Sequence, residues 1–156
     1  MSSGLHSDHN VIIDFFSEEI EFELEYTESI IRWLLDAYQQ EQKTVAALNY
    51  IFCSDVYLHQ INMQYLNHDT LTDIITFSNA REGAPIEGDI FISVDRVKEN
   101  AANFGVSFEK EMLRVIIHGS LHLMSYKDKT EEDQKLMTQK ENFYIARFAK
   151  KEEPYN

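Results

Sequence analysis

Residues 107–128 read SFEKEMLRVIIHGSLHLMSYKD, and this segment indicates both the fold and the chemistry of the chain. Ser107 is a favourable N-cap residue, so a long helix is predicted from there to about Leu123. Five apolar side chains would embed this helix in a hydrophobic core: Val115, Ile116, Ile117, Leu121 and Leu123.

Two histidines of this helix, His118 and His122, are four residues apart. This spacing places both imidazoles on one helix face, one turn apart. Both can therefore reach one ion at the roughly 2 Å that zinc requires. Asp128 follows the predicted helix end, and its carboxylate can turn back as a third ligand. Three protein ligands would leave one position open for water, which is typical of a catalytic zinc site.

The two histidines are also compatible with a structure that binds no metal. Such spacing arises by chance, and a histidine among apolar residues is often a hydrogen-bonded core group. Two unpaired imidazoles in a core would be costly to desolvate, and an ion would remove that cost. Gly119 is expected to leave open space beside His118 for a substrate or water. Gly119 also stands where proteases of the His-Glu-x-x-His type carry their general base, which disfavours a metalloprotease.

Outward from this helix, apolar patterns predict strands and helices that alternate without regular βαβ repeats. We expect strands at residues 11–16, 44–53, 74–78 and 88–93, a turn at 67–70 and a loop at 81–87. Further helices are expected at 27–42, after Ser54, up to Gly105 and from Thr130 onward. Thr27, Ser54, Thr130 and either Ser93 or Asp95 are the expected caps. An α+β single domain with a small mixed β-sheet packed against several helices follows.

The chain has 156 residues, of which 44% are hydrophobic and 26% charged, as expected for one globular domain. Residues 1–9, which include His6 and His9, are predicted to be a tail, and residues 10–156 a single domain. The single cysteine, Cys53, lies in an apolar run and indicates a reducing compartment. A polar N-terminus and the lack of a long apolar run predict a cytoplasmic protein that does not contact membranes.

The net charge of −13 is unevenly distributed. Residues 1–80 carry 13 acids and two bases, whereas residues 81–156 carry 14 acids and 12 bases. Acidic residues keep a small protein soluble, and we favour that interpretation. The negative net charge weakens the hypothesis that the protein is a nuclease, but it does not exclude it. Basic residues close to a site matter more for RNA binding than the net charge of the whole chain.

Three segments resemble the YbeY family of ribosomal-RNA maturation endoribonucleases, in the family's order and spacing. His118-Gly-Ser-Leu-His122-Leu-Met-Ser-Tyr is similar to the signature His-Gly-x-Leu-His-Leu-x-Gly-Tyr-Asp-His. Residues 62–65 and 69–77, NMQY and DTLTDIITF, are similar to the family's Asn-x-x-Tyr-Arg and Asp-x-Pro-Thr-Asp-Val-Leu-Ser-Phe. Residues 88–90 match its Gly-Asp-Ile strand.

This resemblance covers roughly residues 10–150 and implies a zinc-dependent endoribonuclease that is specific for single strands. It implies a role in maturing the 3′ end of small-subunit ribosomal RNA and in ribosome quality control. Ribosomal RNA and ribosomal particles would be its partners, and DNA would not. His118 and His122 would bind the ion.

Four positions depart from the family pattern: Asp128 replaces a His, Ser125 a Gly, Leu66 an Arg and Leu71 a Pro. Asp128 adds negative charge to the site and tolerates harder ions such as manganese or magnesium. Leu66 removes a side chain well suited to phosphate. Arg114 and His68 are candidates to supply positive charge instead, although either can be a surface or packing residue.

Asp73 has two possible roles, as a turn or cap residue or as the acceptor that orients a metal-binding histidine. Asp73 and Arg114 are the candidate catalytic side chains besides the metal-bound water. Phe15, Phe16, Trp33, Phe77 and Phe91 are predicted to belong to the core.

Two other functions are compatible with these residues. One is a ribosome-assembly binding module whose metal site is structural or vestigial, a hypothesis motivated by Leu66 and the acidic N-terminal half. The other is a metallohydrolase acting on another class of substrate.

Overall fold

The computed structural model describes residues 11–67 and 72–152. In chain order its elements are β1 (Ile12–Glu18), α2 (Thr27–Gln40), β2 (Val45–Cys53), α3 (Asp55–Leu66), β3 (Ile74–Ser78), β4 (Ile86–Ser93), α4 (Val94–Phe104), α5 (Phe108–Leu123) and α6 (Glu131–Glu152). The predictions that fall on residues 1–9, His68 and Leu71 lie outside the described residues.

The four strands form one mixed sheet in the order β1-β2-β4-β3. β1, β2 and β4 are parallel, and β3 pairs with β4 antiparallel. Ile13 on β1 is paired with Leu48 on β2, and Leu48 is paired in turn with Gly88 on β4, which sets the register of the three parallel strands. The predicted α+β class with a small mixed sheet is confirmed.

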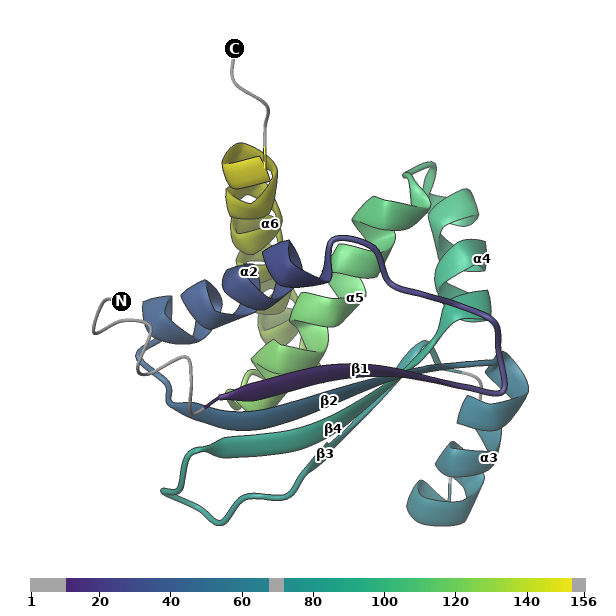
Figure 1. The fold of residues 1–156 in the computed structure, drawn as a ribbon, viewed down its shortest axis with the longest axis horizontal. Coiled ribbons are helices and arrows are strands. Elements are labelled where there is room, and N and C mark those ends of the chain that lie inside the picture. The colour runs from purple at the N-terminus through teal and green to yellow at the C-terminus, as the bar shows by residue number, and fades with distance from the viewer. Residues whose placement is uncertain (1–10, 68–71, 153–156) are drawn as a thin grey trace.

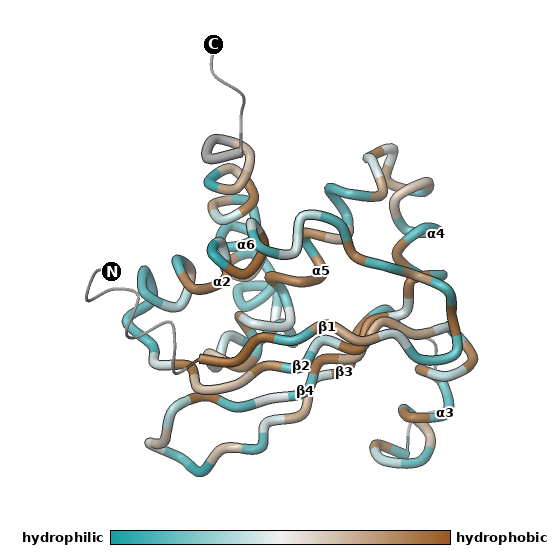
Figure 2. The backbone as a smooth tube through the Cα atoms, viewed as in Figure 1, coloured by the Kyte–Doolittle hydropathy of each residue, from teal (hydrophilic) through white to brown (hydrophobic). Residues whose placement is uncertain are grey.

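Helices pack on both faces of the sheet, and more of them lie on one face than on the other (Figure 1). α2, α5 and α6 lie over one face, and α3 packs against the other. Figure 2 shows hydrophobic stretches along β1 and in α5, whereas α6 alternates between hydrophobic and hydrophilic residues. Ile116, Ile117 and Leu121 are completely buried, so α5 is a core helix, as predicted.

A buried polar cluster fixes α5 against the sheet. The Tyr50 hydroxyl on β2 donates to the Ile116 carbonyl at 2.9 Å and lies 2.8 Å from the Ser120 hydroxyl. The Tyr38 hydroxyl on α2 donates to Ser120 at 3.0 Å. Burial raises the pKa of both tyrosines, which therefore stay protonated as donors. These bonds set the depth at which α5 sits and hence the position of His118 and His122.

Several helix caps were predicted correctly. Ser54, Ser93 and Ser107 each accept a hydrogen bond from the backbone N–H three residues on, and Thr130 accepts one from Asp133 N–H at 3.0 Å. Ser93, rather than Asp95, is the cap of α4.

Three local predictions were wrong. Thr27 does not cap α2, because the N-cap is Tyr26 in the left-handed region with no side-chain bond. β4 begins at Ile86, inside the predicted loop, because Ile86 pairs with Val45. Phe16 is 49% exposed. It lies on β1, the edge strand, and its side chain is on the face of that strand that no helix covers. Within the described residues no helix is long and apolar enough to cross a membrane.

Candidate metal centre

His118 and His122 lie one turn apart on α5 with their rings 4.5 Å apart, nearly perpendicular at 86°. Their side chains are 20% and 24% exposed, although the residues around them on α5 are buried. The two imidazoles share one helix face, as predicted from their spacing, and they stand at the boundary between core and solvent.

Asp128 lies beyond the end of α5 and turns back toward both rings. Its Oδ2 is 3.4 Å from His118 Nε2 and 3.2 Å from His122 Nε2. One potential ligand atom from each of these three residues lies within 4.8 Å of the others. The donor set of two imidazole nitrogens and one carboxylate fits a divalent ion such as zinc.

Each histidine is oriented by an acceptor on its Nδ1 side. His118 Nδ1 is 2.6 Å from Glu141 Oε2, and His122 Nδ1 is 2.9 Å from the Tyr126 carbonyl oxygen. A carboxylate and a carbonyl only accept, so they hold a proton on Nδ1. Nε2 of each ring faces the Asp128 carboxylate, which also only accepts, so in the absence of an ion a proton on Nε2 is favoured as well. Because Nδ1 stays engaged by its own acceptor, Nε2 is the nitrogen that would give up its proton and bind an ion.

Glu141 is the functional residue that sequence reasoning missed. It lies on α6, is 6% exposed, and also accepts from the Arg114 guanidinium at 2.9 Å. Arg114 donates in addition to Asn142 at 2.9 Å. Arg114 is thus bound to α6 one turn away from His118, where it holds the Glu141 carboxylate in place. No local motif links Glu141 to the histidines, because the contact exists only after α6 packs on α5.

Asp73 lines the same pocket as the three candidate ligands. Of its two possible roles, Asp73 does not have that of acceptor for a histidine Nδ1, because Glu141 and the Tyr126 carbonyl make those contacts. Its backbone carbonyl accepts from Ser93 N–H at 3.0 Å, just before β3. Burial is the main cause that raises the pKa of Asp73 above its ordinary value, while the nearby His118 opposes the shift.

The pocket has a volume of about 370 Å³. Its ten lining residues are Asn62, Leu66, Thr72, Asp73, Ile74, Ile75, Thr76, His118, His122 and Asp128. Leu66, which stands where the YbeY signature has Arg, is 40% exposed at this pocket. Two of the three segments that resemble the family, residues 62–77 and 118–126, therefore contribute to one pocket, whereas residues 88–90 do not line it.

Gly119 does not open the pocket, contrary to the prediction. A Cβ at this position would lie 2.9 Å from Ile74 Cδ1 and 2.9 Å from Ile90 Cγ2. Real Cβ atoms do not approach so closely, so Gly119 serves the close packing of α5 on β3 and β4. This approach brings the histidines to the edge of β3.

Acidic neighbours determine the proton affinity of His118. Burial alone would lower its pKa, but the hydrogen bond and charge of Glu141, together with Asp73 and Asp128, raise the pKa above its ordinary value. A site that holds an imidazole among three carboxylates attracts a cation, whether a proton or a metal ion.

Glu41, at the end of α2, holds the segment that carries Asp128 in place through hydrogen bonds. Glu41 accepts from the Tyr126 hydroxyl at 2.6 Å, from the Tyr144 hydroxyl at 2.5 Å and from Lys140 at 3.0 Å. Because Tyr126 also supplies the carbonyl that orients His122, Glu41 indirectly supports the site. Ser125 turns the chain here with φ of 84°, a conformation that favours glycine.

Comparison with known proteins gives the same assignment as the motifs. The family model of endoribonuclease YbeY matches residues 12–149. A protein from Flavobacterium johnsoniae named "Endoribonuclease YbeY" is 51% identical over 133 residues, which are 85% of this chain and 95% of that protein. One of the same name from Christiangramia forsetii is 48% identical over 136 residues, 87% of this chain and 94% of the relative.

A solution structure from Thermotoga maritima has a similar fold, with a TM-score of 0.63 and 28% identity over 89% of this chain and 90% of that one. The family model spans nearly all described residues, and the relatives are about half identical over most of their length. The chain therefore belongs to the endoribonuclease YbeY family.

Proposed function

We propose that this protein is a metal-dependent endoribonuclease in which His118, His122 and Asp128 hold one ion. The convergence of two imidazole nitrogens and a carboxylate within 4.8 Å, at the wall of a pocket, carries the proposal. Family membership supports RNA as the substrate, since the matched relatives are named as endoribonucleases.

Zinc is the proposed ion, one per chain, because two imidazoles and a carboxylate form a three-ligand set typical of catalytic zinc. Asp128 in place of a third imidazole makes manganese or magnesium the alternative ions, since carboxylates suit harder cations. When bound, the ion would stabilise negative charge that develops on a phosphodiester.

The chain's own residues have distinct tasks in this proposal. Glu141, held by Arg114, and the Tyr126 carbonyl orient the two histidines. Asp73 is the titratable pocket residue that remains outside the ligand set, and burial raises the pKa of its carboxyl. A carboxyl with a raised pKa exchanges protons closer to neutral pH, so we assign proton transfer to Asp73.

The proposed substrate is single-stranded ribosomal RNA, with a role in maturing the 3′ end of the small-subunit RNA and in ribosome quality control. Ribosomal particles would be the partners, and neither DNA nor membranes would be. This role would place the protein in the cytoplasm, where its substrate is made. The family resemblance supports these finer assignments.

The test combines elemental mass spectrometry with cleavage of a labelled single-stranded ribosomal RNA fragment. Residues 1–9 are removed so that His6 and His9 do not bind metal adventitiously. His122→Ala and Asp128→Ala are compared with His59→Ala, which removes a histidine from α3, outside the site.

We expect about one zinc per parent chain, and we expect both bound metal and cleavage to be lost in His122→Ala but retained in His59→Ala. Unchanged cleavage by His122→Ala would contradict the proposed site. Co-sedimentation with ribosomal particles without cleavage under any divalent ion would favour a binding module instead.

A further inference from the structure

The outer edge of β1 has no strand partner within residues 11–67 and 72–152. β1 is the first strand in the order β1-β2-β4-β3 and pairs only with β2. An edge strand presents unpaired backbone N–H and C=O groups, and proteins usually protect such edges with charge or cover. Here Asp14 and Glu18 lie on the strand, and Ile12 is 58% and Phe16 49% exposed.

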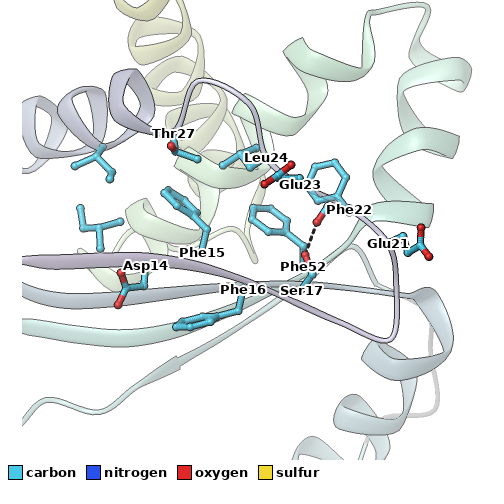
Figure 3. A pocket seen from close by; sticks show the side chains of 12 residues that line it. Asp14, Phe15, Phe16, Ser17, Glu21, Phe22, Glu23, Leu24, Thr27 and Phe52 are labelled. Carbon is cyan, nitrogen blue, oxygen red and sulfur yellow. Dashed lines mark hydrogen bonds between the residues drawn. The ribbon is translucent and has the colours of Figure 1, made fainter.

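A pocket of about 840 Å³ lies along this edge, on the opposite side of the sheet from α3, and extends around β1 (Figure 3). We call it the β1-edge pocket. It is lined by Ile13, Asp14, Phe15, Phe16, Ser17, Glu21, Phe22, Glu23, Leu24, Thr27, Ile31 and Phe52. None of the titratable residues of the candidate metal centre is among these.

Aromatic rings form the floor of the β1-edge pocket. The rings of Phe22 and Phe52 lie 5.1 Å apart, and those of Phe15 and Phe52 lie 6.2 Å apart. Phe15 and Phe52 point toward the helices, while Asp14 and Phe16 point to the other side of β1 (Figure 3). The Ser17 hydroxyl donates to the Phe22 carbonyl at 2.5 Å, which holds the loop after β1 in place.

The charge of the β1-edge pocket has one sign. Asp14, Glu21 and Glu23 line it, and none of its lining residues is Lys, Arg or His. Phosphate groups are therefore repelled, which disfavours RNA, whereas cationic side chains are attracted. The exposed face of β1 alternates apolar and acidic side chains, in the order Ile12, Asp14, Phe16 and Glu18.

We infer that the β1-edge pocket binds an extended, lysine- and arginine-rich protein segment, which adds a strand to the outer edge of β1. Backbone hydrogen bonds to β1 would supply affinity, as in other cases of strand addition. Alternate side chains of the partner would face opposite sides of the extended sheet. On one side, basic residues would meet Asp14 and Glu18, and on the other, apolar residues would enter between Phe15 and Phe22.

The probe is a fluorescent peptide of about seven residues, to match the length of β1, in which lysine alternates with valine. One matched peptide carries proline at its centre, which removes a backbone donor and blocks strand pairing. Another carries glutamate in place of lysine. Binding to the full chain is measured by fluorescence anisotropy at ~0.15 M salt, where exposed charges are screened beyond about 8 Å.

The alternating basic peptide should bind and shift the amide NMR signals of residues 12–18, and the proline and glutamate peptides should bind at least about tenfold more weakly. Glu21→Lys/Glu23→Lys changes two exposed acidic residues that line the pocket and should weaken binding about tenfold, since their attraction for the basic peptide is replaced by repulsion. Phe16→Thr should also weaken binding while keeping a strand-forming residue. RNA cleavage by both variants should equal that of the parent.

Glu131→Lys/Glu132→Lys on α6 makes the same charge change away from the β1-edge pocket and is the matched control. Equal binding of the proline peptide would show attraction by charge alone and would overturn the proposal. The same would follow if Glu21→Lys/Glu23→Lys bound as tightly as the control, or if the amide shifts lay outside β1 and its loop. Because none of these readouts uses metal or cleavage, they are independent of the proposed nuclease activity.

Discussion

The His118 imidazole on α5 and the Glu141 carboxylate on α6 lie 2.6 Å apart, in a contact that joins two helices at the edge of the candidate metal centre. Glu141 is 6% exposed, so its charge is compensated by His118 and by Arg114 rather than by water. The contact determines which imidazole nitrogen is available to an ion. Metal-binding histidines generally depend on such a partner.

Glu141→Gln is expected to weaken metal binding by roughly 10- to 100-fold, the usual effect of losing such a partner. The amide keeps the size of the side chain but loses the negative charge that holds a proton on His118 Nδ1. Chelator-competition titrations measure the affinity. Glu132→Gln, on an exposed position of the same helix, is the control. Equal affinities for the two variants would exclude this role of Glu141.

Asp128→His, which introduces the third histidine of the YbeY signature, should favour zinc over manganese. The neutral imidazole is a softer ligand and leaves more positive charge on the ion, which makes the ion a stronger Lewis acid. The acid limb of the pH–cleavage profile should therefore move to lower pH. Lys127→His adds an imidazole to the same loop at an exposed position and should change neither property. A profile that stays in place would contradict this account of Asp128.

Leu66→Arg should lower the KM for single-stranded RNA, because it places a cation at the pocket. The dependence of log KM on log salt concentration should become steeper by about one unit, as expected for one added phosphate contact. Met63→Arg, 48% exposed on the same helix but outside the pocket lining, controls for the added charge. The prediction fails if both variants change KM equally.

Ser125→Gly should raise the free energy of unfolding by about 1 kcal/mol, because φ of 84° is costly for a residue with a Cβ. For a chain of this size, such a gain corresponds to an increase in Tm of roughly 2–4 °C. Lys127→Gly, at an exposed position of the same loop that is not among the positive-φ residues, should give no gain. Differential scanning calorimetry without added metal makes the comparison.

Glu41→Gln should destabilise the protein at neutral pH by about 1–3 kcal/mol, the usual cost of disrupting hydrogen bonds to a partly buried charge. Burial alone would raise the pKa of Glu41, but the hydrogen bonds from Tyr126, Tyr144 and Lys140 lower it below its ordinary value. The stability that this carboxylate contributes is therefore fully present above its unfolded pKa, and it is lost as pH falls through the lower folded pKa.

The difference in unfolding free energy between parent and Glu41→Gln should thus be constant from pH 7 to about pH 5 and should shrink in more acidic solution. Urea unfolding at several pH values measures this difference in unfolding free energy. The contributions of the other carboxyl groups are the same in parent and variant, so they cancel in the difference. Glu25→Gln, on the exposed loop before α2, is the control. A difference that grows on acidification would contradict the proposed role of Glu41.

Local patterns were sufficient for the secondary structure wherever the cause is local. The caps Ser54, Ser93 and Ser107 bond to backbone groups only three residues away, so short sequence windows contain both partners. Thr27 failed as a predicted cap because the loop before α2 enters through Tyr26 in a left-handed conformation. Phe16 failed as a predicted core residue because strand order, which composition does not reveal, puts β1 at an edge.

By itself the sequence determined that His118 and His122 share one helix face and that Asp128 can reach them, because four- and six-residue separations span only about one turn of helix and a short loop. Only the tertiary structure decided what surrounds them. Glu141, Asp73 and Glu41 come from α6, the start of β3 and the end of α2, and each acts through packing between distant segments. Helix periodicity is a property of neighbouring residues, whereas the partner of a buried charge depends on how whole elements pack.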